Sequence, residues 1–72
     1  MATFLIKSID GDLPMYSCNY RNQAIRQADF FRLCNKKCYI LKQFSKDGHP
    51  HVVRIEHDAN TNSWIEKQSE KM

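Results

Sequence analysis

The dipeptide Asp47-Gly48 lies between two β-strand-like segments and constrains the fold more than any other feature of the sequence. The flanking segments, CYILKQFS (38–45) and HVVRIEH (51–57), are rich in β-branched and aromatic residues. Asp-Gly readily adopts the positive φ angles of a two-residue hairpin turn. The sequence therefore predicts an antiparallel hairpin with a defined register. The predicted pairs are Phe44 with His51, Lys42 with Val53, Ile40 with Ile55, and Cys38 with His57.

Two further strands are predicted before the hairpin. The segment TFLIKSI (3–9) favours a strand and ends at the turn-forming residues 10–12. The segment LPMYS (13–17) can return as a short antiparallel strand, and Pro14 restricts it to an edge or a strand start.

Residues 18–37 change to a helical period. Asn19 suits the N-cap position, because its side-chain oxygen can accept a backbone N–H of the first turn. Asn35 can end the helix in a left-handed conformation. Five residues fall on one face at helical spacing and predict the side that packs on a sheet: Tyr20, Ala24, Ile25, Ala28 and Phe31.

After the hairpin, ANTN (59–62) predicts a turn and SWIEK (63–67) a last strand. The element order is strand, short strand, helix, then two or three strands. This order predicts a small α+β domain, an antiparallel sheet of three to five strands with one helix packed on one face. A chain of 72 residues has room for one such domain, over residues 1–67, and residues 68–72 are expected to fray.

The composition excludes several classes of protein. Hydrophobic residues make up 42% of the chain and charged residues 26%, which fits a folded domain rather than a disordered one. No apolar run approaches the roughly 20 residues of a membrane-spanning helix. The first residues lack a signal-peptide pattern, and an odd number of cysteines fits reduced thiols. We therefore expect a cytoplasmic protein without membrane association.

A zinc site is the most specific chemistry that the sequence suggests, because two cysteines precede two closely spaced histidines. The predicted hairpin places His51 roughly 20 Å from Cys38, which no single ion can bridge. Cys34, Cys38 and His57 can approach one another, with Asp58 as a weak fourth ligand. The simpler interpretation is that both cysteines pack as small apolar residues. We therefore predict no metal and no cofactor.

No catalytic constellation stands out in the sequence. A pair of Cys38 and His57 lacks both an orienting group and an oxyanion hole. Gly11 and Gly48 are both explained by turns, which leaves no glycine for a phosphate-binding loop. The sequence therefore predicts a protein that is not an enzyme.

One helix can cover only one face of the sheet, so the other face should carry exposed apolar side chains. We expect Tyr39, Leu41, Val52 and Arg54 on that face, joined by Leu5 or Trp64. Exposed apolar patches on small domains often mark interaction surfaces. Two alternatives remain open: the tail folds over this face, or a homodimer buries it.

The favoured function is a protein-binding module that blocks a partner by steric occlusion, in the manner of small phage or mobile-element regulators and inhibitors. Aromatic and apolar anchors ringed by basic residues would supply the contact. The predicted partner-binding residues are Arg26, Phe30, Arg32, Leu33, Tyr39, Lys42, Arg54 and Trp64.

A small RNA- or DNA-binding regulator is the alternative. The net charge is only +3, and acidic residues interrupt the basic ones. A basic helix stripe and a basic hairpin beside an aromatic ring would nevertheless suit single-stranded nucleic acid. The candidate residues are Arg21, Arg32, Lys36, Lys37, Tyr39, Lys42, Lys46 and Arg54.

Overall fold

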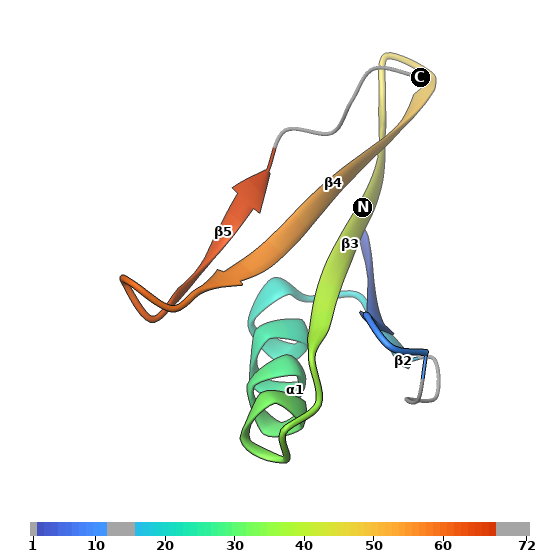
Figure 1. The fold of residues 1–72 in the computed structure, drawn as a ribbon. Helices are drawn as coiled ribbons and strands as arrows, with labels where there is room; N and C mark the ends of the chain where they lie inside the picture. The colour runs from blue at the N-terminus through green and yellow to red at the C-terminus, as the bar shows by residue number, and fades with distance from the viewer. Residues whose placement is uncertain (1, 12–15, 68–72) are drawn as a thin grey trace.

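The computed structural model describes residues 2–11 and 16–67 as a five-stranded antiparallel sheet with one helix across one face (Figure 1). The strand order is β2-β1-β3-β4-β5, and the helix connects β2 to β3. The prediction of a small α+β fold is confirmed. The elements in chain order are β1 (Thr3–Ser8), β2 (Tyr16–Cys18), α1 (Arg21–Leu33), β3 (Cys38–Lys46), β4 (His49–Asp58) and β5 (Ser63–Lys67).

The hairpin of β3 and β4 turns at Asp47-Gly48, as predicted. Both residues have positive φ angles, 53° and 76°, as a type I′ turn requires. The first three predicted pairs form, down to Ile40 opposite Ile55. Among the described residues the ladder between β3 and β4 ends there, so the predicted fourth pair does not form.

Beyond Ile40 and Ile55, β3 and β4 diverge (Figure 1). β3 continues beside β1 as far as Cys38, and the Ile9 N–H donates to the Lys37 carbonyl at 2.9 Å. β4 instead continues beside β5 as far as Asp58. We call the gap between residues 37–39 and 56–58 the fork. The two halves of the sheet separate there.

The helix starts one residue later than the sequence predicts. Tyr20, in an extended conformation, is the N-cap, and no side chain of the described residues caps it. The prediction of Asn19 as the N-cap is therefore wrong. Because β2 runs to Cys18, paired with Phe4, the chain uses both Asn19 and Tyr20 to leave the sheet before the first helical bond forms.

The helix ends as predicted, with Asn35 in the left-handed region at φ 64°. The Lys36 N–H donates to the Phe31 carbonyl at 2.9 Å, and the Asn35 N–H donates to the Arg32 carbonyl at 3.0 Å. These two bonds form a Schellman motif, which satisfies carbonyls of the last turn.

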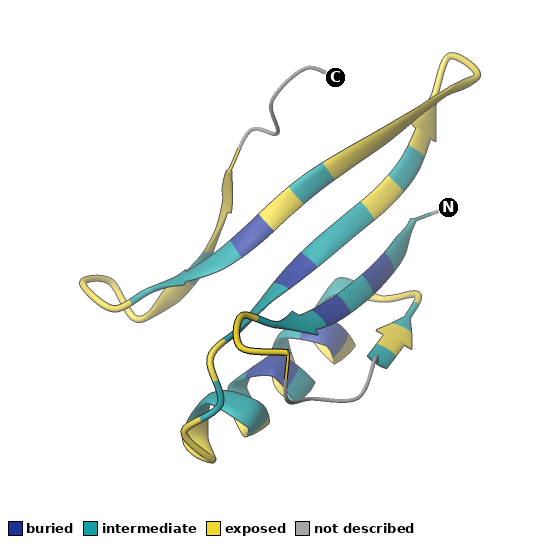
Figure 2. Cartoon of the chain, turned by 45° about the vertical axis from the view of Figure 1, so that its right-hand side comes forward, coloured by how far each residue is buried: buried dark blue, intermediate teal, exposed yellow. Residues whose placement is uncertain are grey.

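The core is a thin layer between α1 and the adjacent half of the sheet (Figure 2). Two alanines face the sheet and let the helix approach closely, and Ile25 and Phe31 pack at its margin. Tyr20 was predicted on this face, but 65% of its surface is exposed because it precedes the first helical turn. The buried residues are Phe4, Ile6, Ala24, Ala28, Ile40 and Ile55.

The two short strands lie at opposite edges of the sheet. β5 forms over the predicted residues, and β2 is a three-residue edge strand that extends one residue past the predicted end. Pro14 and the tail at 68–72 lie outside the described residues. No helix in the described part of the chain is long and apolar enough to cross a bilayer.

Candidate functional site

The sheet face opposite α1 combines apolar and basic side chains, and we call it the uncovered face. Leu5 lies opposite Leu41, and Leu41 lies opposite Arg54, so these three side chains form one row across three strands. Strand alternation places Tyr39, Val52 and Ile65 on the same side. Val52 and Ile65 are 39% and 37% exposed. α1, the one helix of the described residues, packs on the other side.

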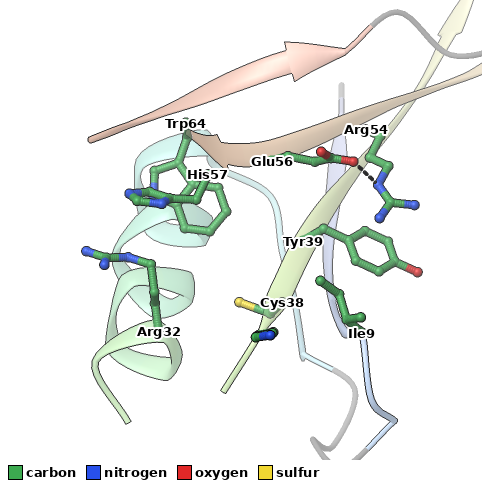
Figure 3. A pocket seen from close by; sticks show the side chains of 9 residues that line it. Ile9, Arg32, Cys38, Tyr39, Arg54, Glu56, His57 and Trp64 are labelled. Atoms are coloured by element: carbon green, nitrogen blue, oxygen red, sulfur yellow. Dashed lines mark ion pairs between the residues drawn. The ribbon is translucent and has the colours of Figure 1, made fainter. Parts of the chain in front are cut away.

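Trp64 does not belong to the uncovered face. It lies opposite His57 and points toward α1 (Figure 3). Its indole N–H donates to Asp29 Oδ1 at 2.9 Å. Of the two residues predicted to extend the uncovered face, the structure places Leu5 there and Trp64 on the helix side.

Arg54 is the most constrained charged residue on the uncovered face. Its guanidinium carbon lies 3.9 Å from the centre of the Tyr39 ring, and its Nε forms an ion pair with Glu56. Stacking on an aromatic ring and a carboxylate contact both restrict the rotamers of the guanidinium. The two Nη nitrogens carry further N–H donors. Arg54 therefore presents two oriented donors.

A largely apolar hollow of about 240 Å³ occupies the fork (Figure 3). Its walls come from both halves of the sheet and from the C-terminal part of α1. The labelled side chains show Tyr39, Ile9, Arg54 and Glu56 apart from the group at the helix. The lining residues are Ile9, Arg32, Lys37, Cys38, Tyr39, Arg54, Glu56, His57 and Trp64.

The helix side of the fork is held by a network centred on Asp29. Its Oδ1 accepts the Trp64 indole N–H and lies 3.5 Å from Arg32 Nε. The His57 ring contacts the Trp64 ring edge to face, with centroids 5.3 Å apart. His57 Nε2 also lies 3.1 Å from Asn62 Oδ1. These contacts tie β5 and the end of β4 to the helix.

Cys38 lies between the fork and the helix. Its thiol donates to the Ala28 carbonyl with an Sγ–O distance of 3.7 Å. Burial, followed by the negative charge of Asp29, raises the pKa of this thiol above its ordinary value of 9.0, while Arg32 opposes the shift. The thiol is therefore protonated at neutral pH, which makes it a poor nucleophile and metal ligand.

The metal-ligand candidates Cys34, Cys38 and His57 are engaged in different surroundings. Cys34 is exposed at the end of α1, Cys38 bonds to the helix backbone, and His57 bonds to Asn62. The described residues contain no group of three or more His, Cys, Asp or Glu side chains that could hold a metal ion.

The predicted partner-binding residues are divided among three surfaces. Phe30, Leu33 and Arg26 are exposed on α1, away from its buried alanines. Tyr39 and Arg54 lie on the uncovered face. The remaining three, Arg32, Lys42 and Trp64, lie on the helix side of the sheet. A single partner surface cannot contact all three sets.

The predicted nucleic-acid residues are divided as well. Lys42 and Lys46 lie on the helix side of the hairpin, opposite Tyr39 and Arg54. Two cations of the helix stripe have acidic neighbours: Arg21 lies 3.9 Å from Glu66, and Arg32 contacts Asp29. Lys36 and Lys37 follow α1 at the entrance to β3. The basic residues therefore form no continuous platform around Tyr39.

No protein-family model matches the chain, and comparisons with curated proteins and with solved structures also gave no match. The function of this protein is therefore inferred from its own residues.

Proposed function

We propose that this protein is a non-enzymatic regulator that docks through the uncovered face on an acidic surface of a partner protein and blocks that surface sterically. Leu5, Leu41, Val52 and Ile65 carry this proposal, because they are apolar side chains on one face of the sheet over which the described chain places no helix. A small apolar face of this kind is a typical protein–protein contact surface.

The charges on the uncovered face favour an acidic partner. Glu56 is paired with Arg54, and Asp58 accepts hydrogen bonds from the turn that follows β4. Lys7 on β1 and Lys67 on β5 lie on the same side of the sheet. A second copy of the chain would bring like charges together, whereas a carboxylate-rich surface complements them.

Nucleic acid is the less favoured partner for a structural reason. A strand that stacks on Tyr39 would meet Arg54, but Lys42 and Lys46 point to the other side of the hairpin. Single-strand binders place aromatic rings and cations along one groove. In this hairpin the two lysines lie away from the Tyr39 ring.

The proposed mechanism needs only a modest interface. A standard protein interface buries about 800 Å² on each partner. The chain exposes 5508 Å² in total, so docking would cover roughly a seventh of its surface. The rest of the domain would then block access to the partner sterically. This mechanism suits a regulator of the phage or mobile-element type.

Affinity capture from a lysate with variants of the uncovered face tests the proposal. Val52→Glu places a negative charge at an exposed position of the face, and Gln23→Glu places the same charge on the exposed surface of α1. We expect capture of a stoichiometric acidic protein that survives nuclease, is lost with Val52→Glu and is retained with Gln23→Glu.

Three results would contradict the proposal. Capture that disappears with nuclease would favour nucleic acid, and a dimer in sedimentation equilibrium that Val52→Glu dissociates would favour self-association. Capture lost with Phe30→Ala but retained with Val52→Glu would move the contact to α1. Spectra of each variant by ¹H–¹⁵N correlation establish beforehand that the fold is intact.

A further inference from the structure

The fork is closed at one end and open at the other. The backbone pair of Ile40 and Ile55 closes it. Beyond that pair, in the part of the chain that the structure describes, the edges of β3 at 38–39 and of β4 at 56–57 have no strand between them. Unpaired strand edges accept an extended chain by backbone hydrogen bonding. A closed fork admits only the end of such a chain, because a continuous strand would have to pass through the Ile40–Ile55 pair.

The entrance of the fork faces the same side as the uncovered face. On the helix side, the Trp64–Asp29 bond and the neighbouring Arg32 restrict access. On the other side, Tyr39 and Arg54 border the hollow (Figure 3). A protein docked on the uncovered face would therefore have direct access to the fork.

The charge of the lining selects one kind of chain end. Arg32, Lys37 and Arg54 line the hollow together with one carboxylate, that of Glu56, and Arg32 is paired with Asp29. Glu56 is already engaged with Arg54, and the Cys38 thiol at the helix side is neutral. The remaining positive charge, that of Lys37, opposes an N-terminal ammonium group and attracts a C-terminal carboxylate.

We propose that the fork is a binding site for the C-terminal end of a partner polypeptide that finishes in an apolar residue. Arg54 and Lys37 would donate to the terminal carboxylate. The last side chain would pack against Ile9 and the Tyr39 ring, which form the apolar wall on the entrance side. The backbone of the last residues would pair with the exposed edge of β3 or β4. This site rests on the proposed docking function and identifies the part of the partner that it recognises.

A titration with a defined peptide tests this site. The probe is an acetylated peptide of four serine and threonine residues followed by leucine, with a free carboxylate. Its matched control is the same peptide with a C-terminal amide. In ¹H–¹⁵N correlation spectra of the labelled protein, we expect the free acid to shift the amides of Tyr39 and Glu56 and the indole N–H of Trp64. The amide should bind about tenfold more weakly or worse, because it lacks the charge-assisted hydrogen bonds.

Variants separate the site from general electrostatic attraction. Arg54→Gln and Lys37→Gln should each weaken binding of the free acid about tenfold. Lys46→Gln removes the same charge at the hairpin turn, well outside the lining residues, and should leave the affinity unchanged. Equal binding of both peptides, shifts confined to other residues, or no shifts up to about 10 mM peptide would each overturn the site.

Failure of this inference is distinguishable from failure of the proposed function. If the peptide does not bind but Val52→Glu abolishes protein capture, the fork does not bind a C-terminus, and the uncovered face is still supported as the docking surface. If the peptide binds at the fork but Val52→Glu leaves capture intact, the C-terminus binding site is supported, and the uncovered face is not the docking surface.

Discussion

Trp64→Phe should destabilise the domain measurably, because the Trp64–Asp29 bond ties β5 to α1. A hydrogen bond to a charged group contributes about 1.5–3 kcal/mol. The Asp29 side chain is 42% exposed and also contacts Arg32, so we expect about 1.5 kcal/mol, the low end. For a domain of this size, that loss corresponds to a decrease in Tm of roughly 6–12 °C. Since 72 residues give a total stability of only about 4–11 kcal/mol, the loss is a substantial fraction of it.

A double-mutant cycle with Asp29→Ala isolates this bond from the smaller size of phenylalanine. The free energy of unfolding is measured by urea titration followed by far-UV circular dichroism, which does not depend on the tryptophan. We expect the double variant to cost about 1 kcal/mol less than the sum of the single variants. Additivity within about 0.3 kcal/mol would refute a direct Trp64–Asp29 bond. Arg32→Gln is the control, because an exposed ion pair contributes at most about 1 kcal/mol.

Four further predictions concern the turns and the thiols. Gly48→Ala should lower the unfolding free energy by about 1–2 kcal/mol in the same titration, through backbone strain alone, because φ is 76° and an added Cβ would meet no atom within 4 Å. Asn35→Gly should raise the unfolding free energy by about 0.5–1 kcal/mol, because glycine adopts the left-handed position after α1 at lower cost. At pH 8, a disulfide reagent should label exposed Cys34 faster than Cys38, as mass spectrometry of peptides would show. The folded state favours the protonated Cys38 thiol, because its pKa is raised there. The resulting contribution to the free energy of unfolding is intact below pH 9.0 and is lost as the pH rises through the raised pKa. An increase in the free energy of unfolding over that pH range would contradict this prediction.

The parts of the fold that the sequence predicts correctly have local causes. The Asp47-Gly48 turn sets the register of the hairpin, because a two-residue turn leaves only one way to pair the strands. Asn35 marks the end of the helix through its tolerance of positive φ. The helical spacing of the apolar residues is enough to predict that Ala24 and Ala28 lie on the buried face of α1. Tyr20, at the helix start, is the exception because its conformation depends on where β2 ends.

The fork has no local sequence signal. Extending the hairpin register predicts Cys38 opposite His57, and nothing within the two strands indicates that they separate. The separation coincides with a contact between Trp64 and Asp29, which are 35 residues apart. Because the sequence does not predict this separation, it predicts only some of the residues around the hollow. The hairpin pattern places Tyr39 and Arg54 on one face, whereas Ile9, Glu56 and Lys37 line the hollow only because the strands diverge.

The uncovered face and the fork have one physical origin. A helix of thirteen residues packs on β1, β2 and β3, and polar contacts such as Trp64–Asp29 and Arg21–Glu66 connect it to β5. Among the described residues, five of the six buried side chains belong to α1, β1 and β3 and only Ile55 belongs to β4, and no helix covers the other face of the sheet. A partner that docks on that face and enters the fork would supply the missing apolar contacts on both. Ligand binding stabilises a folded state by about 2.7 kcal/mol at a hundred times the Kd. For a domain whose own stability is about 4–11 kcal/mol, we expect the complex to melt well above the free protein.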